Sequence, residues 1–576
     1  MRASETVFWC ALLLGANGAA GPASPVADAA MRGDKSAVAA LLRQNADVNA
    51  PQPDGATAIQ WAAYNNDLAT ADLLIAAGAD VKTPNRDGAT PLQLASINGN
   101  APMIEKLLAA GADPNERSPR GETPLMFASR NGNTEAIKVL LDRRADVNAK
   151  ESLRGTTALM WAVEQRHPEA VRLLVERGAN VMAVTNPDNK GGTAYLAPSV
   201  QQRAAQDRNF ALRPNRPVGR GQAQGPDDVA ALDAAAAEAA FGRNRQNTDG
   251  GGLTPLVFAA REDCLECARI LVQAGADVNQ TSRYGWTPLL TAVQNRHYQL
   301  AKYLLEHGAD PNIKNKGGWT PLYLAVDNRN IEGGDYPVRP ADMDHLDFIK
   351  LLIDRGADVN GRICGAQSTA AECKGDSTET RTIFTMQWLY EAGATPFLRA
   401  AQSADLPVMK LLLQHGADPK IETANGDTAL MVASGIGWVE GVTFEWSEAD
   451  NLEAVKMCLD LGIDPNAVNK DGRTALHGAA HKGRNAVVQI LVDHGAKLDA
   501  HDNGSRDTFT GALFGHTWEP VDYARGLVRV GVQSAIAHPE TEALLEKLMK
   551  DRGIPIPPPT NQTVCLTDLC NGKSRD

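Results

Sequence analysis

The sequence has no long basic run, and it has a single long apolar run. These two features limit the classes of partner and the membrane association that can be expected. Over 576 residues, acidic side chains outnumber basic ones by 69 to 57, and the net charge is −12. An acidic surface repels phosphate backbones, so we expect no binding to nucleic acid. Beyond the N-terminus, no segment approaches the roughly 20 apolar residues of a membrane-spanning helix. We therefore expect a soluble, folded protein without membrane insertion.

Motifs for catalysis are also missing. The sequence contains no glycine-rich phosphate loop, no nucleophile elbow and no spaced carboxylate pair. Two short patterns remain as candidates. Cys264 and Cys267 have the spacing of thiol oxidoreductases, and His477 and His481 stand one helical turn apart, as zinc ligands do. An enzyme, redox or metal protein with a site built from these pairs or from inserted segments is therefore the alternative function.

Neither pair carries the rest of its motif. No histidine follows Cys267, and no second cysteine pair at matching spacing completes a zinc set. Gly478 stands where a zincin helix needs a glutamate. We therefore predict no catalytic residues, no metal site and no cofactor.

The one long apolar run lies at the N-terminus. Residues 7–16, "VFWCALLLGA", are followed by the small residues "NGAAGPAS", which is the layout of a secretory signal cleaved near Ala20 or Ala23. Residues 1–20 are therefore predicted to be a signal peptide, and the protein is expected in the periplasm or outside the cell. The alternative is that this run is an apolar start to the first helix.

A period of 33 residues runs through most of the chain. Each unit has a threonine that opens a "T-[PA]-[LIF]" triplet and, about 21 residues later, an element similar to "GADVN". These two motifs, recurring every 33 residues, resemble the ankyrin repeat. The resemblance implies an all-α solenoid of stacked repeats, each a helix-turn-helix with a hairpin loop, that binds other proteins. The threonines are Thr57, Thr90, Thr123, Thr157, Thr254, Thr287, Thr320, Thr395, Thr428 and Thr474.

Alignment on this period predicts eleven full repeats and a degenerate twelfth. Repeats one to five fall in 21–182 and repeats six to eleven in 252–503, with a terminal capping repeat over 504–559 and a tail over 560–576. An insertion over 183–251 is expected to hold a stunted repeat start and an alanine-rich helix. Shorter inserts are predicted at 331–344, 361–394 and 438–450. We expect a monomeric array of the kind that bacteria export.

The cysteines occur as neighbours in the sequence. Seven remain once the signal peptide is removed, and six of them form three local pairs, while Cys458 takes the place of a core leucine. Disulfides persist only outside the cytosol, so an exported protein should oxidise these pairs. The predicted disulfides are Cys264–Cys267, Cys364–Cys373 and Cys565–Cys570.

The resemblance also indicates where an unidentified protein partner would bind. In ankyrin proteins, partners contact the residue before the threonine, the loop tip and the exposed residues after the small pair of the first helix. Repeats seven and eight place two tryptophans in register there, with arginines behind, as in an interaction hot spot. The predicted contacts are Trp286, Asn295, Arg296, Trp319, Asp327, Asn328 and Arg329.

The alternative is that Trp286 and Trp319 pack on each other and on the stems of the loops. By contrast, the template assigns four other aromatic residues to the core, because their framework position normally packs against neighbouring repeats. These are Trp61, Phe127, Trp161 and Phe258.

Overall fold

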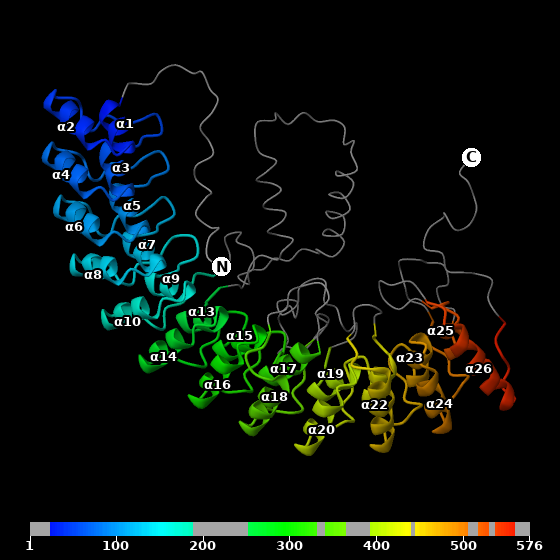
Figure 1. Ribbon diagram of the computed structural model, residues 1–576. Helices are drawn as coiled ribbons and strands as arrows, with labels where there is room; N and C mark the ends of the chain where they lie inside the picture. Colours follow the sequence, from blue (N-terminus) through cyan, green and yellow to red (C-terminus); the bar gives the residue numbers. More distant parts are fainter. Residues whose placement is uncertain are drawn as a thin grey trace, which may run out of the picture. The chain divides into compact units, whose positions relative to one another are not determined.

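The computed structural model of the protein describes residues 24–187, 251–330, 340–364, 392–438, 444–504, 517–528 and 536–558. In these residues helices alternate with turns, and β pairing is limited to two isolated bridges, Lys150–Thr157 and Pro187–Gly251. The predicted all-α repeat solenoid is confirmed (Figure 1). None of the described helices is both long enough and apolar enough to cross a membrane. The chain divides into two compact units, residues 1–183 and 184–576.

Unit 1 contains five helix pairs (Figure 1). The first helices of the pairs stack in one column and the second helices stack beside them in another. The first helices are α1 (Pro25–Met31), α3 (Ala58–Tyr64), α5 (Pro91–Ile97), α7 (Pro124–Asn131) and α9 (Ala158–Glu164). The second helices are α2 (Lys35–Arg43), α4 (Leu68–Ala76), α6 (Ala101–Ala109), α8 (Thr134–Asp142) and α10 (Pro168–Glu176).

Seven further helix pairs are described in unit 2, with the same two-column arrangement. The first helices are α13 (Pro255–Glu262), α15 (Pro288–Gln294), α17 (Pro321–Arg329), α19 (Pro396–Gln402), α21 (Ala429–Ser434), α23 (Ala475–His481) and α25 (Pro520–Ala524). The second helices are α14 (Leu265–Gln273), α16 (Tyr298–Glu306), α18 (His345–Asp354), α20 (Leu406–Gln414), α22 (Glu448–Asp460), α24 (Asn485–Asp493) and α26 (Pro539–Asp551).

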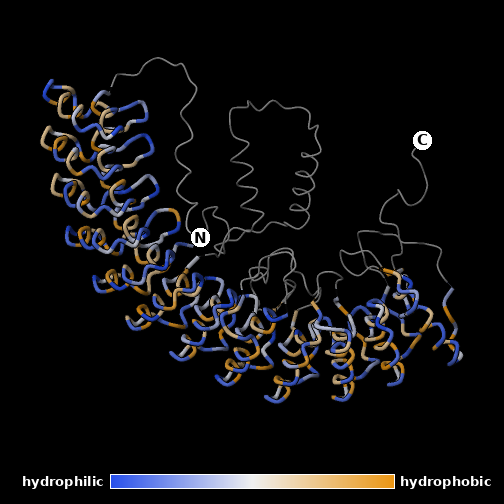
Figure 2. The backbone as a smooth tube through the Cα atoms, viewed as in Figure 1, coloured by the Kyte–Doolittle hydropathy of each residue, from blue (hydrophilic) through white to orange (hydrophobic). Residues whose placement is uncertain are grey.

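The repeated threonine starts each first helix. In α5 the Thr90 hydroxyl accepts from the N–H of Gln93 at 3.2 Å, and the Gln93 side chain accepts from the N–H of Thr90. Pro91 follows at the first helical position, where a missing N–H leaves no hydrogen bond unmade. Figure 2 shows apolar residues recurring in every helix of unit 1 and hydrophilic loops joining each second helix to the next repeat. The sequence pattern therefore fixes both the helix starts and their buried faces.

The asparagine of "GADVN" ties each repeat to the next. Asn115 donates its side-chain amide to the carbonyl oxygen of Arg144 at 3.0 Å, and its side-chain oxygen accepts from the N–H of Asp146 at 2.7 Å. Seven described repeats have this pair of hydrogen bonds. The recurrence of the motif along the chain thus reflects a contact between repeats as well as a turn within one.

Several predicted features lie outside the described residues. They include the signal peptide over 1–20, the alanine-rich helix of the insertion, most of the inserts at 331–344 and 361–394, residues 439–443 of the insert at 438–450, and the tail over 560–576. Cys373, Cys565 and Cys570 lie outside as well.

Candidate interaction surface

The two tryptophans predicted as partner contacts are buried. Trp286 is 5% exposed and Trp319 is 0% exposed. The Trp319 ring packs edge-on against Tyr323, with the ring centroids 4.9 Å apart. The prediction that these two rings form an exposed hot spot is therefore wrong, because both belong to the core of unit 2.

The charged residues predicted beside them are engaged within the array. Asp327 is buried and accepts from the guanidinium of Arg399 at 2.6 Å. Arg329 pairs with Asp405 at 2.8 Å. The first pair joins α17 to α19, and the second joins α17 to the N-cap residue of α20, so both serve packing between repeats eight and nine.

The amide residues of the predicted site make similar contacts. The side chain of Asn328 is buried and donates to the carbonyl oxygen of Val293 at 2.7 Å. Asn295 and Arg296 are half-buried, and Arg296 donates to the carbonyl oxygen of Asn328 at 2.9 Å. A role of Asn295 and Arg296 in partner binding stays a prediction.

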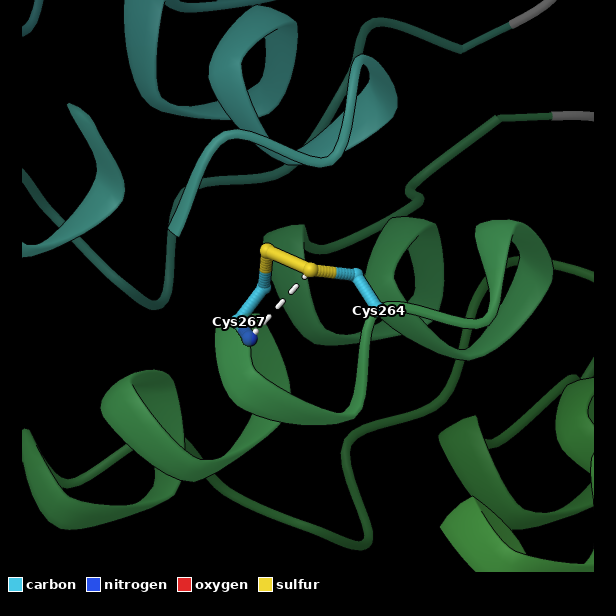
Figure 3. The surroundings of a disulfide bond; sticks show 2 residues. All are labelled: Cys264 and Cys267. Carbon is cyan, nitrogen blue, oxygen red and sulfur yellow. Dashed lines mark hydrogen bonds between the residues drawn. A yellow bond between two sulfur atoms is a disulfide. The ribbon is translucent and has the colours of Figure 1, made fainter. Parts of the chain in front are cut away.

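Cys264 and Cys267 are joined by a disulfide at the start of α14 (Figure 3). Cys264 is the N-cap residue, and its sulfur accepts from the N–H of Cys267 at 3.3 Å. Both side chains are buried. A disulfide used in exchange reactions needs an accessible sulfur, so the burial favours a structural role.

The remaining described cysteines are buried as well. Cys364 is disulfide-bonded, and Cys373, its predicted partner, lies outside the described residues. Cys458 is a free thiol in the core, and burial raises its pKa to about 12. Such a thiol is not ionised at neutral pH and is a poor nucleophile.

The two histidines of the alternative metal site occupy structural positions. The Nδ1 atom of His477 accepts from the N–H of Thr474 at 3.0 Å, and its Nε2 atom contacts the carbonyl oxygen of Trp518 at 3.3 Å. Burial lowers the pKa of His477 and of His481 to about 4, so both rings are neutral at neutral pH. Within the described ranges, no group of three or more His, Cys, Asp or Glu side chains is placed to hold a metal ion.

Unit 1 exposes a row of large apolar side chains that the sequence analysis did not single out. Met31, Tyr64 and Ile97 are 42%, 52% and 46% exposed. Each is the last residue of its first helix, in α1, α3 and α5, and they are spaced 33 residues apart. Three consecutive repeats therefore present one large apolar side chain each at the same position.

Hydrogen bonds between repeats hold these three positions in register. Asn98, which follows Ile97, donates to the carbonyl oxygen of Tyr64 at 3.0 Å. Asn131, one repeat further along, donates to the carbonyl oxygen of Ile97 at 3.3 Å. The end of each first helix is thus fixed against the end of the next one.

A second row lies one helical turn earlier. Half-buried large side chains occupy this position in α3, α5, α7 and α9, and the Trp61 ring packs edge-on against Tyr64 with centroids 6.0 Å apart. The expectation that Trp61, Phe127 and Trp161 are core residues is therefore wrong in part, whereas Phe258 in unit 2 is buried. We call the two rows the apolar stripe: Met31, Trp61, Tyr64, Leu94, Ile97, Phe127 and Trp161.

The same helix positions in unit 2 are different. Where α3 has Trp61 and Tyr64, α15 has Thr291 and Gln294, and α19 has Arg399 and Gln402. Thr291, Arg399 and Gln402 are buried and polar. Large exposed apolar side chains at these positions are thus a feature of unit 1 among the described first helices.

A sequence signal for the stripe was present. Met31, Tyr64 and Ile97 directly follow the small pairs Ala29-Ala30, Ala62-Ala63 and Ala95-Ser96. The rule that partners contact the residues after the small pair identifies these positions when it is applied to the first three repeats. Applied to repeats seven and eight, the same rule selects Asp327 and Asn328, which are buried, and Asn295, Arg296 and Arg329, which are half-buried.

The residues that the structure describes form a helical repeat protein with an exposed apolar stripe on unit 1. Profiles of the ankyrin repeat match more than half of the chain. The profile for three copies matches 26–118, 98–185, 229–315 and 282–363, the profile for many copies matches 447–492, and the single-repeat profile matches 392–424. The chain belongs to the ankyrin repeat family. One match begins at residue 229, inside the predicted insertion over 183–251.

Similar proteins share parts of the array. Mouse ankyrin repeat and SOCS box protein 16 is 29% identical over 154 residues, which cover 26% of this chain and 32% of that protein. Human transient receptor potential cation channel subfamily A member 1 is 27% identical over 169 residues, which cover 27% of this chain and 14% of the channel protein. The solved ankyrin repeat domain of human ASB11 is 21% identical, with a TM-score of 0.35, and the match covers 50% of this chain and 100% of that domain. The chain thus spans about a third or less of these two curated relatives. Ankyrin repeats indicate a scaffold for protein–protein interaction.

Proposed function

We propose that the protein is an exported scaffold without catalysis of its own, which binds a protein partner through the apolar stripe of unit 1. The observation that carries the proposal is the exposure of Met31, Tyr64 and Ile97 at one position in three consecutive repeats. Contiguous exposed apolar side chains with polar surroundings are typical of interaction sites. Single exposed apolar residues are common, but a row at repeat spacing is not explained by chance exposure.

The stripe residues are separable from those that hold the array together. In α3, the buried residues are Ala58, Ile59, Gln60, Ala62 and Ala63, whereas Trp61 and Tyr64 face away from the core. Substitution at an exposed position changes the free energy of unfolding by about 0.5 kcal/mol or less. A polar side chain at Tyr64 should therefore remove binding without unfolding the repeat.

Site-specific crosslinking in the producing cell tests the binding site. A photo-reactive residue at position 64 or 97 should give the same covalent adduct, and the adduct should disappear when Met31→Ser is added. The matched control places the photo-reactive residue at Glu105, which is exposed on α6 in the other column. Adducts of equal yield from position 105, or none from position 64, would show that the stripe is not the binding site.

Two observations support export: the Cys264–Cys267 disulfide and the apolar run at residues 7–16, which is typical of a signal peptide. The burial of both sulfur atoms supports the absence of redox catalysis at this pair. Thiol labelling of the protein purified from its native compartment tests this. We expect about one labelled group after unfolding, at Cys458, and none before. Labelling of all seven cysteines of the mature chain would contradict export and would return the redox and metal alternatives.

A further inference from the structure

We propose that the insert of repeat ten is a clip that makes repeats eight to eleven unfold and refold as one cooperative unit. The clip consists of two adjacent residues of the insert, Glu445 and Trp446, whose side chains contact repeats that lie after and before repeat ten. In a regular repeat array each repeat contacts mainly its neighbours, so that opening can stop at any interface. The clip lies in unit 2, and it is independent of the binding site proposed on unit 1.

Trp446 reaches back across repeat nine to repeat eight. Its indole N–H donates to the side-chain oxygen of Asn330, the residue after α17, at 2.9 Å. The guanidinium of Arg329 lies 4.7 Å from the centroid of its ring. The backbone N–H of Trp446 donates to the carbonyl oxygen of Ser403, the residue after α19, at 3.2 Å. One residue of repeat ten is thus tied to both preceding repeats.

The ring of Trp446 covers a polar cluster between repeats eight and nine. Arg329 and Asn330 both donate to the carboxylate of Asp405, at 2.8 and 3.1 Å. Asn330 and Asp405 are buried. Removing the ring would admit water to the ion pair, and water weakens the attraction between its charges. The interface between repeats eight and nine therefore depends on a side chain from repeat ten.

Glu445 reaches forward to repeat eleven. Its carboxylate accepts from the ammonium of Lys482 at 2.6 Å and from the guanidinium of Arg484 at 2.8 Å. Lys482 follows α23 and is buried, and its ammonium lies 5.6 Å from the centroid of the Trp438 ring, at the start of the insert. A buried ammonium is costly unless a counter-charge lies beside it. Repeat eleven therefore depends on the insert of repeat ten for the counter-charge of Lys482.

The two sets of contacts are mechanically linked, because Glu445 and Trp446 are consecutive in the chain. Separation of repeat eight breaks the contacts of Trp446, and separation of repeat eleven breaks the ion pairs of Glu445. Either event loosens the insert and, with it, the contacts on the other side. The clip thus couples repeats eight and eleven, which are not neighbours in the array.

Hydrogen exchange of the full-length protein, read separately for each helix, tests this coupling. Trp446→Ala removes the contacts described above with repeats eight and nine, yet exchange of the most protected amides of α23, in repeat eleven, should become at least tenfold faster. Glu445→Gln removes the ion pairs with repeat eleven, yet exchange in α17, in repeat eight, should rise by a similar factor. In a cooperative unit, a loss of stability at one place accelerates exchange throughout the unit.

Tyr303→Ala is the matched control. Tyr303 is a half-buried residue of α16, and the guanidinium of Arg269 in α14 lies 5.8 Å from the centroid of its ring, so this contact joins two neighbouring repeats. The effect of Tyr303→Ala should stay within repeats six and seven. Circular dichroism checks that each variant keeps its helices. Trp446 is 44% exposed, so its substitution should leave the fold intact.

Two results would overturn the proposal. If Trp446→Ala leaves exchange in α23 unchanged, or Glu445→Gln leaves exchange in α17 unchanged, the insert contacts these repeats without coupling them. If either variant accelerates exchange in α14 and α16 as much as in α17 and α23, the cooperative unit is not bounded by repeats eight and eleven. A milder variant, Trp446→Phe, keeps an aromatic ring and loses the indole N–H, so it should accelerate exchange less than Trp446→Ala, in α17 and α23 alike.

Discussion

Asn115 and Asp146 are joined by a hydrogen bond of 2.7 Å from the N–H of Asp146 to the side-chain oxygen of Asn115. The same asparagine also donates to the carbonyl oxygen of Arg144, so one side chain satisfies a donor and an acceptor of the next repeat. Lysine stands at this position in two repeats, as Lys82 and Lys420. Lysine has no acceptor, so it cannot hold the amide of the next turn in this way.

Lys82→Asn should therefore stabilise unit 1. Completing the two hydrogen bonds to the following turn, at Gly111 and Asp113, is worth about 0.5–1.5 kcal/mol at an exposed site. Thermal unfolding of unit 1 measures the change. The reciprocal variant Asn115→Lys is the control and should lower the melting temperature. If Lys82→Asn has no effect while Asn115→Lys destabilises, an asparagine at position 82 cannot form the two hydrogen bonds to the next repeat.

Substitutions in the buried pair of Asp327 and Arg399 should have non-additive effects on stability. Both side chains are buried and their atoms lie 2.6 Å apart. Removing one partner leaves an uncompensated buried charge, so Asp327→Asn or Arg399→Met should each destabilise repeats eight and nine by about 3–5 kcal/mol. The double variant should lose less than the sum of the two single variants.

Hydrogen exchange of the amides in α17 and α19 is the suitable measurement, because a long repeat array does not unfold in one step. If the loss of stability in the double variant equals the sum of the two single losses, the two charges act independently.

Gly478 should not tolerate a methyl group. A glycine-to-alanine change inside a helix ordinarily stabilises it by about 1 kcal/mol. Here an added Cβ would lie 2.8 Å from the backbone nitrogen of Ile436 and 3.0 Å from the carbonyl carbon of Gly435. Backbone atoms cannot move aside as a flexible side chain can, so Gly478→Ala should destabilise repeats ten and eleven by about 1–3 kcal/mol.

Hydrogen exchange of the amides in α21 and α23 should show this loss, because these two helices hold Gly478 and precede Gly435. Unchanged or slower exchange would mean that α21 and α23 can separate to admit the methyl group.

The fold could be predicted because the same helix-start and helix-end residues recur in each repeat. Thr90, Pro91 and the glycine at position 78 carry the local chemistry of a helix start and a helix end, and this chemistry recurs at 33 residues. Each repeat packs mainly on its neighbours, so no long-range information is needed. The positions of the first and second helices can therefore be predicted from a local pattern that repeats along the sequence.

The interaction site could be predicted only in kind. Repeat position indicates which residues face away from the second helices, but exposure depends on what lies against them. Asp327 is buried because Arg399 reaches it from 72 residues away, and Arg329 pairs with Asp405 from 76 residues away. A local sequence pattern does not predict ion pairs between residues so far apart in the chain. Tyr64 and Asp327 both follow a small pair near the end of a first helix, yet Tyr64 is 52% exposed and Asp327 is buried, so repeat position alone does not separate them.

The stability of unit 1 should depend on pH through Glu116. Burial raises the pKa of this carboxyl from its ordinary value of 4.5 to about 7, and the charge of Asp113 adds to the rise, while the hydroxyl of Thr90 donates to it and opposes the rise. The folded state therefore holds the proton more tightly than the unfolded state. The stabilising contribution is complete below pH 4.5 and is lost as the pH rises through 7.

Glu116→Gln should remove this dependence, because an amide does not titrate. The melting temperature of the unaltered protein, compared with that of Glu116→Gln, should fall between pH 5 and pH 8. The comparison with the variant is needed because other carboxylates in unit 1 titrate in the opposite sense. The pKa of Asp67 and that of Asp80 are lowered, the latter by the hydrogen bond from Thr83, so both stabilise unit 1 as the pH rises through the acid range. A difference between the two proteins that stays constant from pH 5 to pH 8 would place the pKa of Glu116 near its ordinary value.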